Sequence, residues 1–175
     1  MKISYNLFWG TVIIAVITHV IAINMLPKTL MNVAFERVGA GRVNQWRLAD
    51  RVTENSRAIV RPAPDFAYSA CAFDLADGPV VIHVAPWEDY WSLSLYQSNS
   101  DNFFVLNDRE SRQGGDIVLV RRGRGAPDDV AGRVVEAPSD RGIALIRRLA
   151  PTAESYAAAA AAARSDVCAA LNAGS

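Results

Sequence analysis

Two runs of polar residues carry the side chains that could bind a ligand. Residues 61–69 place a guanidinium, a carboxylate, a phenol and a hydroxyl at the entrance of a predicted strand, and residues 99–109 surround an aromatic pair with polar groups. A guanidinium can clamp an anion, and tyrosine rings can form the wall of a pocket. The candidate ligand-binding residues are therefore Arg61, Asp65, Tyr68, Tyr90, Tyr96, Asp101 and Asn102.

The same residues also have a purely structural interpretation, which the sequence leaves open. Asp65 and Asp101 lie where carboxylates commonly cap turns, and Arg61 can pair with a neighbouring acid. A third interpretation is a hydrolase of the cell envelope that uses Asp65 or Asp101 with Tyr68. That chemistry requires the groups to meet in one pocket.

Motifs that would identify a common enzyme class are absent from the sequence. There is no phosphate-binding loop, no dinucleotide-binding glycine fingerprint opening a helix, and no nucleophile elbow. His83 is the one histidine outside the apolar N-terminal segment, and its strand position predicts a sheet histidine rather than a catalytic base. The sequence therefore predicts no catalytic set, no metal site and no cofactor, and it leaves open whether the protein is an enzyme.

Two cysteines, Cys71 and Cys168, offer two interpretations that the sequence does not separate. In an exported domain they could form a disulfide that ties the terminal helix to a strand. Closing so long a loop would stabilise the fold by roughly 4–5 kcal/mol in the chain-entropy treatment. Alternatively both are buried free thiols, since Cys71 shares a predicted strand face with Phe73 and Leu75.

Length and charge limit the classes of protein that the chain can belong to. Its 175 residues suit one domain with an appendage. Eighteen basic residues balance eighteen acidic ones, which argues against nucleic acid as a partner because phosphate binding requires an excess of Lys and Arg. Hydrophobic residues make up 51% of the chain and are concentrated near its N-terminus.

Residues 7–26 are predicted to form a transmembrane helix. No charged residue lies between Lys2 and Lys28, and twenty helical residues extend roughly 30 Å, the thickness of the hydrocarbon core of a bilayer. A cleaved signal would end in small residues, whereas this segment ends in Met25-Leu26-Pro27. The lipid bilayer is thus a predicted partner through residues 7–26, but the flanking charges do not determine the orientation.

Period-two alternation of apolar residues dominates the sequence after residue 64 and predicts strands at 68–75, 80–85, 90–96, 102–106, 116–120, 133–136 and 142–148. Short strands separated by turn residues favour an antiparallel β-sandwich-like domain, and an alanine-rich helix that begins near Pro151 is expected to close it. The predicted division is a short N-terminal segment (1–6), a transmembrane helix (7–26), a transition with a short helix at 44–53 (27–57), and the mainly β domain (58–175).

From residue 55 to residue 172 the sequence resembles the bacterial family catalogued as domain of unknown function 1254. The matching features are R-P-x-x-D-x-x-Y-S from Arg61, the D-L-x-x-G-P-V-V strand pair, the Y-W-S-L-S-L strand and D-N-F. The resemblance implies a β-sandwich-like, usually exported domain without an established activity. It also implies a separately encoded companion, because longer relatives join this domain to one of unknown function 1214.

The combined expectation is a single-pass protein of the bacterial inner membrane with its C-terminal domain in the periplasm. That domain would bind a partner protein or a small envelope ligand. A structural subunit of a membrane complex is the remaining alternative.

Overall fold

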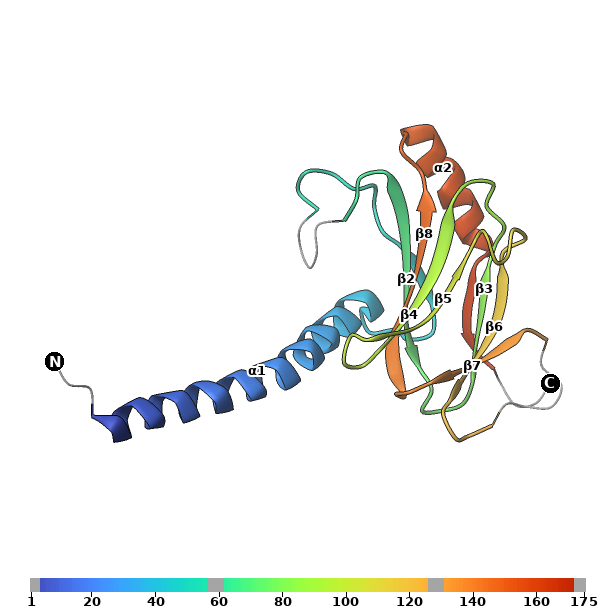
Figure 1. Ribbon diagram of the computed structural model, residues 1–175. Coiled ribbons are helices and arrows are strands. Elements are labelled where there is room, and N and C mark those ends of the chain that lie inside the picture. Colours follow the sequence, from blue (N-terminus) through green and yellow to red (C-terminus); the bar gives the residue numbers. More distant parts are fainter. Residues whose placement is uncertain (1–3, 57–61, 126–130, 172–175) are drawn as a thin grey trace.

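The computed structural model describes residues 4–56, 62–125 and 131–171. A long N-terminal helix leads into two stacked β-sheets, and a short second helix lies at one end of them (Figure 1). The elements are, in chain order, α1 (Tyr5–Gly39), β1 (Trp46–Leu48), β2 (Phe66–Asp74), β3 (Val80–Val84), β4 (Trp91–Gln97), β5 (Asn102–Asn107), β6 (Gly115–Arg121), β7 (Arg133–Ala137), β8 (Arg141–Leu149), α2 (Ala153–Ala162), a 3-10 turn (Ala163–Ser165) and β9 (Val167–Ala170).

The two sheets enclose one hydrophobic core. One sheet has the strand order β1-β2-β8-β4-β5, and the other has the order β7-β6-β3-β9. Alternate residues point inward, so that Phe73 on β2, Ile82 on β3 and Leu93 on β4 are completely buried between the sheets. The predicted mainly β, sandwich-like fold with a long apolar helix in front and a helix near its C-terminal end is confirmed.

One strand pair departs from the predicted antiparallel pattern. β7 runs parallel to β6, with Ile117 opposite Arg133 and Arg121 opposite Ala137. β7 begins beside the start of β6, so the two strands run in the same direction. The other described strand pairs are antiparallel.

α1 is longer than the predicted transmembrane helix and includes the first part of the segment that was predicted to be a transition. The helix continues through Pro27 to Gly39, where the N–H of Ala40 donates to the carbonyl of Glu36. Met31, Phe35 and Gly39 are spaced by four residues and are buried against the sandwich. This contact stabilises the helix beyond the proline, although Pro27 removes one helical N–H donor.

The short helix predicted at residues 44–53 is wrong, because residues 46–48 of this segment form β1 at the edge of the five-stranded sheet. The side chain of Asn44 connects the start of this segment to the end of β2. Its NH2 group donates to the carbonyl of Asp74 at 3.0 Å, and its Oδ1 accepts from the N–H of Asp74 at 2.8 Å. Trp46 then packs against the core, which the helix prediction did not provide for.

The closing helix α2 ends at Ala162, and a 3-10 turn and β9 follow it. Thr152 caps α2 through a reciprocal pair of hydrogen bonds with Ser155, at the predicted start. The chain is not helical beyond residue 165, because Val167 lies on β9 opposite His83. Backbone pairing with β3 replaces the last helical turns.

Cys71 and Cys168 form a disulfide. Cys71 lies on β2 and Cys168 on β9, so the bond joins the two sheets rather than a helix to a strand. Both cysteines are buried, and the bond closes a loop with a sequence separation of 97 residues.

Tyr156 fastens α2 to the segment after β1, and its replacement by phenylalanine should destabilise the protein. Its hydroxyl donates to the carbonyl of Ala49 at 2.6 Å, and loss of this bond is expected to cost about 1 kcal/mol at neutral pH. Burial, and secondarily the charge of Asp50, raises the pKa of Tyr156.

A raised pKa means that the folded state favours the neutral phenol. The corresponding stability is present below about pH 10, the ordinary tyrosine pKa, and is lost as the pH rises through the raised value. Urea unfolding midpoints should therefore fall more steeply above about pH 10 for the wild type than for Tyr156→Phe. Parallel pH profiles for the two proteins would contradict this role.

Candidate functional site

Most of the predicted ligand-binding residues gather on the surface of the five-stranded sheet that points away from the other sheet, here called the outer face. Strand register places Tyr68 opposite Arg147, and Arg147 opposite Ser92. α1 packs on this face at the end of β2 and the start of β8. The outer face comprises Phe66, Tyr68, Ala70, Tyr90, Ser92, Ser94, Tyr96, Asn102, Val105, Asn107, Ile143, Leu145 and Arg147.

The three predicted tyrosines lie along this face. Tyr68 is half-buried, and its ring centroid is 6.3 Å from that of Phe66, which in turn meets Tyr90 edge-to-face at 5.8 Å. The hydroxyl of Tyr68 accepts from the N–H of Ala63 at 3.0 Å and so also holds the chain entering β2. Tyr96 lies opposite Ile143 toward the other end.

The predicted polar residues divide between this face and the turns. Asn102 reaches the face opposite Tyr96, and its amide donates to the carbonyl of Phe104 at 3.4 Å. Asp101 lies in the β4–β5 turn, where its carboxylate accepts from the amides of Gln97 and Asn99 at 3.1 and 2.7 Å. This bonding agrees with the turn-capping interpretation of Asp101.

Asp65 and Asp101 do not meet. Asp65 is exposed just before β2, and its carbonyl accepts from the N–H of Ala150 beyond the end of β8. Asp101 lies by Gln97, which pairs with Gly142 near the start of β8. About eight residues of strand, or roughly 26 Å, separate the backbone positions of the two residues, so their carboxylates cannot act as one acid–base pair. Arg61 lies outside the described residues.

Arg147 is the residue of this face that the sequence analysis missed. Its guanidinium is half-buried between Tyr68 and Ser92, and Nε donates to the hydroxyl of Ser92 at 3.2 Å. Among the described residues no carboxylate lies within ion-pair distance of it. Alternation along Ile-Arg-Arg-Leu would have identified it, because neighbouring strand residues point to opposite faces.

Arg148, the next residue, shows the contrast. Its guanidinium points into the core, is 2% exposed, and is bound by the carboxylate of Asp166 at 2.7 and 2.8 Å. Arg147, by contrast, donates a hydrogen bond to Ser92 but has no carboxylate partner among the described residues. A half-buried guanidinium of this kind is suited to bind a carboxylate or another planar anion.

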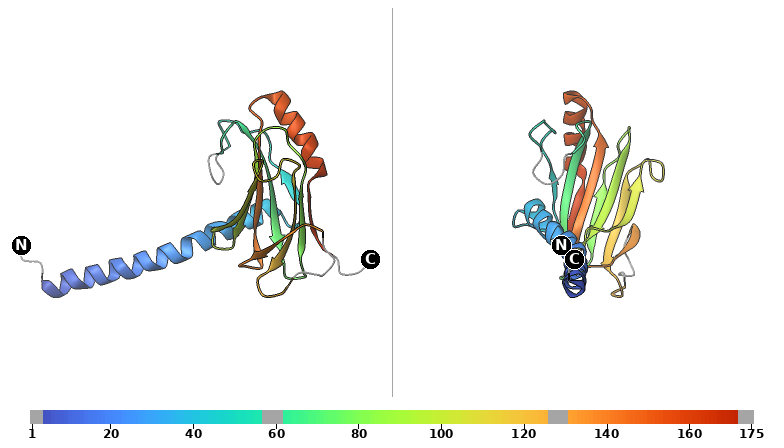
Figure 2. Two further views of the ribbon diagram at one scale, coloured as in Figure 1. Left: turned by 45° about the vertical axis from the view of Figure 1, so that its right-hand side comes forward. Right: turned by 60° about the vertical axis from the view of Figure 1, so that its left-hand side comes forward.

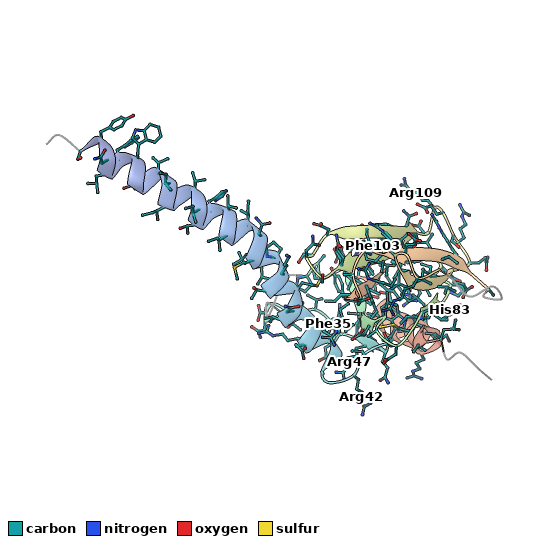
Figure 3. The ribbon with its side chains drawn as sticks, turned by 90° about the horizontal axis from the view of Figure 1, so that it is seen from below. Phe35, Arg42, Arg47, His83, Phe103 and Arg109 are labelled. Carbon is teal, nitrogen blue, oxygen red and sulfur yellow. A yellow bond between two sulfur atoms is a disulfide. The ribbon has the colours of Figure 1, made fainter. Side chains whose placement is uncertain are left out.

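His83 lies on the four-stranded sheet, on the side away from α1 (Figure 3). Its Nδ1 is 2.7 Å from the carboxylate of Asp116 on β6, and both side chains are solvent-accessible. This arrangement agrees with the predicted sheet-face histidine. No group of three or more metal-ligating side chains occurs in the described part of the chain.

α1 is long and apolar enough to cross a membrane or to serve as a signal sequence. Its most apolar window has a mean hydropathy of 2.0, and none of that window is buried inside the protein. Many large side chains of its first two-thirds, such as Leu7, Phe8, Ile14 and Leu26, are more than half exposed.

One of the two solved structures that resemble this chain shares its fold, the VPA0106 protein. The VPA0106 protein from Vibrio parahaemolyticus superposes with a TM-score of 0.67 at 15% identity over 86% of this chain and 37% of its own. A putative uncharacterized protein from Burkholderia cenocepacia gives 0.47 at 19% identity over 65% of this chain and 33% of its own. The chain thus spans about a third of the length of each.

No curated protein matches the sequence. The sequence pattern of the family described as "Protein of unknown function (DUF1254)" matches residues 43–169, which include every strand of the sandwich except the last residue of β9. This confirms the resemblance seen in the strand motifs. The chain therefore belongs to the DUF1254 family.

Proposed function

We propose that this protein is a membrane-anchored binding protein of the bacterial cell envelope. Residues 7–26 of α1 cross the inner membrane, the sandwich lies in the periplasm, and the outer face binds a partner protein. The observation that carries the proposal is Arg147, a half-buried guanidinium with no carboxylate partner among the described residues, on a face that one helix covers only at its end.

The exposure of the apolar part of α1 supports the anchor. A helix that belonged to the core of a soluble domain would bury its apolar side chains, whereas none of this window is buried. Leaving so many large apolar groups in water would be unfavourable, and a bilayer removes that cost.

The disulfide supports a periplasmic location. Cys71 and Cys168 are bonded in the core, and such bonds form and persist in oxidising compartments such as the bacterial periplasm. With the sandwich on the periplasmic side, α1 acts as an uncleaved signal anchor.

The partner proposed for the outer face is the separately encoded companion with a domain of unknown function 1214. Two facts support a partner of this kind. The family resemblance implies such a companion, and the part of the Vibrio VPA0106 chain that matches this chain is only 37% of it, so further protein accompanies the matched part there.

Reversal of the charge at Arg147 should disrupt this binding. When the full-length protein is purified in detergent from cells that make both proteins, Arg147→Glu should recover at least tenfold less companion than the wild type. The physical reason is that a carboxylate held against Arg147 would then face a like charge, which typically costs several kcal/mol.

Arg122→Glu is the matched control, since Arg122 is exposed and lies 4.0 Å from Glu136 on the other sheet. It should recover the companion at wild-type yield. Equal recovery with Arg147→Glu and the wild type would contradict binding through the outer face.

A further inference from the structure

The direction in which α1 leaves the sandwich determines which surface looks toward the bilayer. We infer that the outer face binds an acidic segment of a membrane-embedded protein, held in the narrow layer between the five-stranded sheet and the membrane. This inference rests on the anchor and the outer face proposed above, and it specifies the class of partner.

The figures show the relevant geometry. In Figure 1, α1 extends to the left from the side of the sandwich formed by β2, β8 and β4, and β3 and β6 lie on the side away from the helix. The right-hand view of Figure 2 looks nearly along α1 and shows the strands of the five-stranded sheet spread out behind it. The helix therefore projects outward from the outer face, and a membrane that contains residues 7–26 lies in front of that face.

Contacts along the last third of α1 fix this direction. The hydroxyl of Ser100 in the β4–β5 turn donates to the carbonyl of Pro27 at 3.1 Å. Further along, the Phe35 ring lies under the guanidinium of Arg141 at 5.5 Å, and Gly39 lies against Ala72. Because α1 is one continuous helix through these contacts, the sandwich is not connected to the membrane span by a flexible linker.

The length of the helix gives the depth of the layer. Phe35 follows Leu26 by nine residues and Gly39 follows it by thirteen, which places the corner of the outer face that α1 contacts, at Ala72 and Arg141, about 13–20 Å from the hydrocarbon core. The β4–β5 turn reaches closer to the bilayer, because Ser100 contacts Pro27. The headgroup region occupies about 5–7 Å of that distance. The remaining depth is about 7–14 Å, which accommodates one helix or one extended segment.

This depth limits the kind of partner that can reach the outer face. A folded domain, that of the proposed companion included, is too thick to enter the layer, so only a single segment of the partner can lie on the face. A segment that emerges from a membrane-embedded protein reaches it directly. There a carboxylate can bind Arg147, flanked by Ser92 and Asn107, while Tyr68 and Tyr96 contact apolar groups.

Photocrosslinking in living cells tests this placement. A benzophenone amino acid replaces Val105 on the outer face, and in a separate strain it replaces Val134 on the opposite surface of the sandwich; these residues are 44% and 45% exposed and lie on edge strands. The probe at residue 105 should yield a crosslink to a protein that alkaline washing does not release from membranes. The probe at residue 134 should not, and Arg147→Glu should reduce the 105 crosslink at least tenfold.

A helix insertion tests the depth of the layer. Seven helix-forming residues between Lys28 and Thr29 add about two turns, which raise the outer face by about 10 Å and turn it by only about 20°. The crosslink at residue 105 should fall at least tenfold. Ser100→Ala, which removes the contact with Pro27 without changing the depth, should retain the crosslink.

The outcomes separate this inference from the proposed function. A product at residue 105 with a protein that alkali releases, a product with lipid alone, no product at all, or a crosslink that survives the insertion would overturn the inference. The proposed anchor fails separately, if the full-length chain is found in the soluble fraction or if alkaline phosphatase fused after Ser175 is inactive. An active fusion combined with an alkali-released partner would leave the proposed function standing.

Discussion

Replacing both Cys71 and Cys168 by alanine is expected to lower the free energy of unfolding by about 4–5 kcal/mol. The bond closes a loop with a sequence separation of 97 residues, and removing it restores most of the conformational entropy of that loop to the unfolded chain. The loss would be a large fraction of the total stability of a domain of this size. It can be measured by urea unfolding of the full-length protein in detergent, followed by tryptophan fluorescence.

A matched comparison separates the crosslink from the packing of the two side chains. Wild-type protein unfolded in the presence of a strong thiol reductant should lose nearly as much stability as the double alanine variant. If both the reduced protein and the variant unfold at the wild-type midpoint, the bond between the sheets does not stabilise the fold.

Asp166→Ala is expected to lower the free energy of unfolding by about 3–5 kcal/mol. The side chain of Asp166 is completely buried and binds the Arg148 guanidinium through both oxygens, and Oδ1 also accepts from the N–H of Ala85 at 2.9 Å. Removing the carboxylate leaves a guanidinium buried without a counter-charge. The same urea unfolding measurement reports the loss.

Two further variants test this explanation. Asp140→Ala removes an ion pair with Arg121 in which the Asp140 side chain is 51% exposed, so it should cost about 0–1 kcal/mol. The double variant Arg148→Met with Asp166→Leu removes both charges and should recover most of the loss. A single Asp166→Ala variant within about 1 kcal/mol of the wild type would refute the importance of the pair.

Arg148 and Asp166 also explain why the chain leaves the helical conformation after residue 165. Burial of the carboxylate beside Ala85 holds Asp166 at the end of β3, and β9 then pairs along that strand. The sequence after α2 is rich in alanine and favours a helix locally. The pairing of distant residues overrides that preference here.

The local pattern of the sequence was sufficient to predict the seven longer strands. Each lies within two residues of its predicted bounds, because a buried face requires apolar side chains at every second position and a strand supplies that spacing directly. The apolar segment at residues 7–26 was predicted for a similar reason, since helicity there depends on composition alone. The family followed from motifs on these same strands.

The candidate site was predicted only in part. Tyr68, Tyr90, Tyr96 and Asn102 share the outer face, but Asp65 and Asp101 lie at opposite ends of the sheet. The alternation along each strand fixes which residues share a face of that strand. Which strands are neighbours, and in what register, depends on contacts between residues far apart in the chain.

The sequence by itself thus determined the apolar helix, the long strands and the family, because each depends on the spacing of residues close together in the chain. Only the tertiary structure decided that α1 continues to Gly39, that β1 and β9 are strands, that the disulfide joins the two sheets, and that Arg147 lies among the tyrosines. Each of these depends on the free energy of contacts between distant segments, which no local pattern contains.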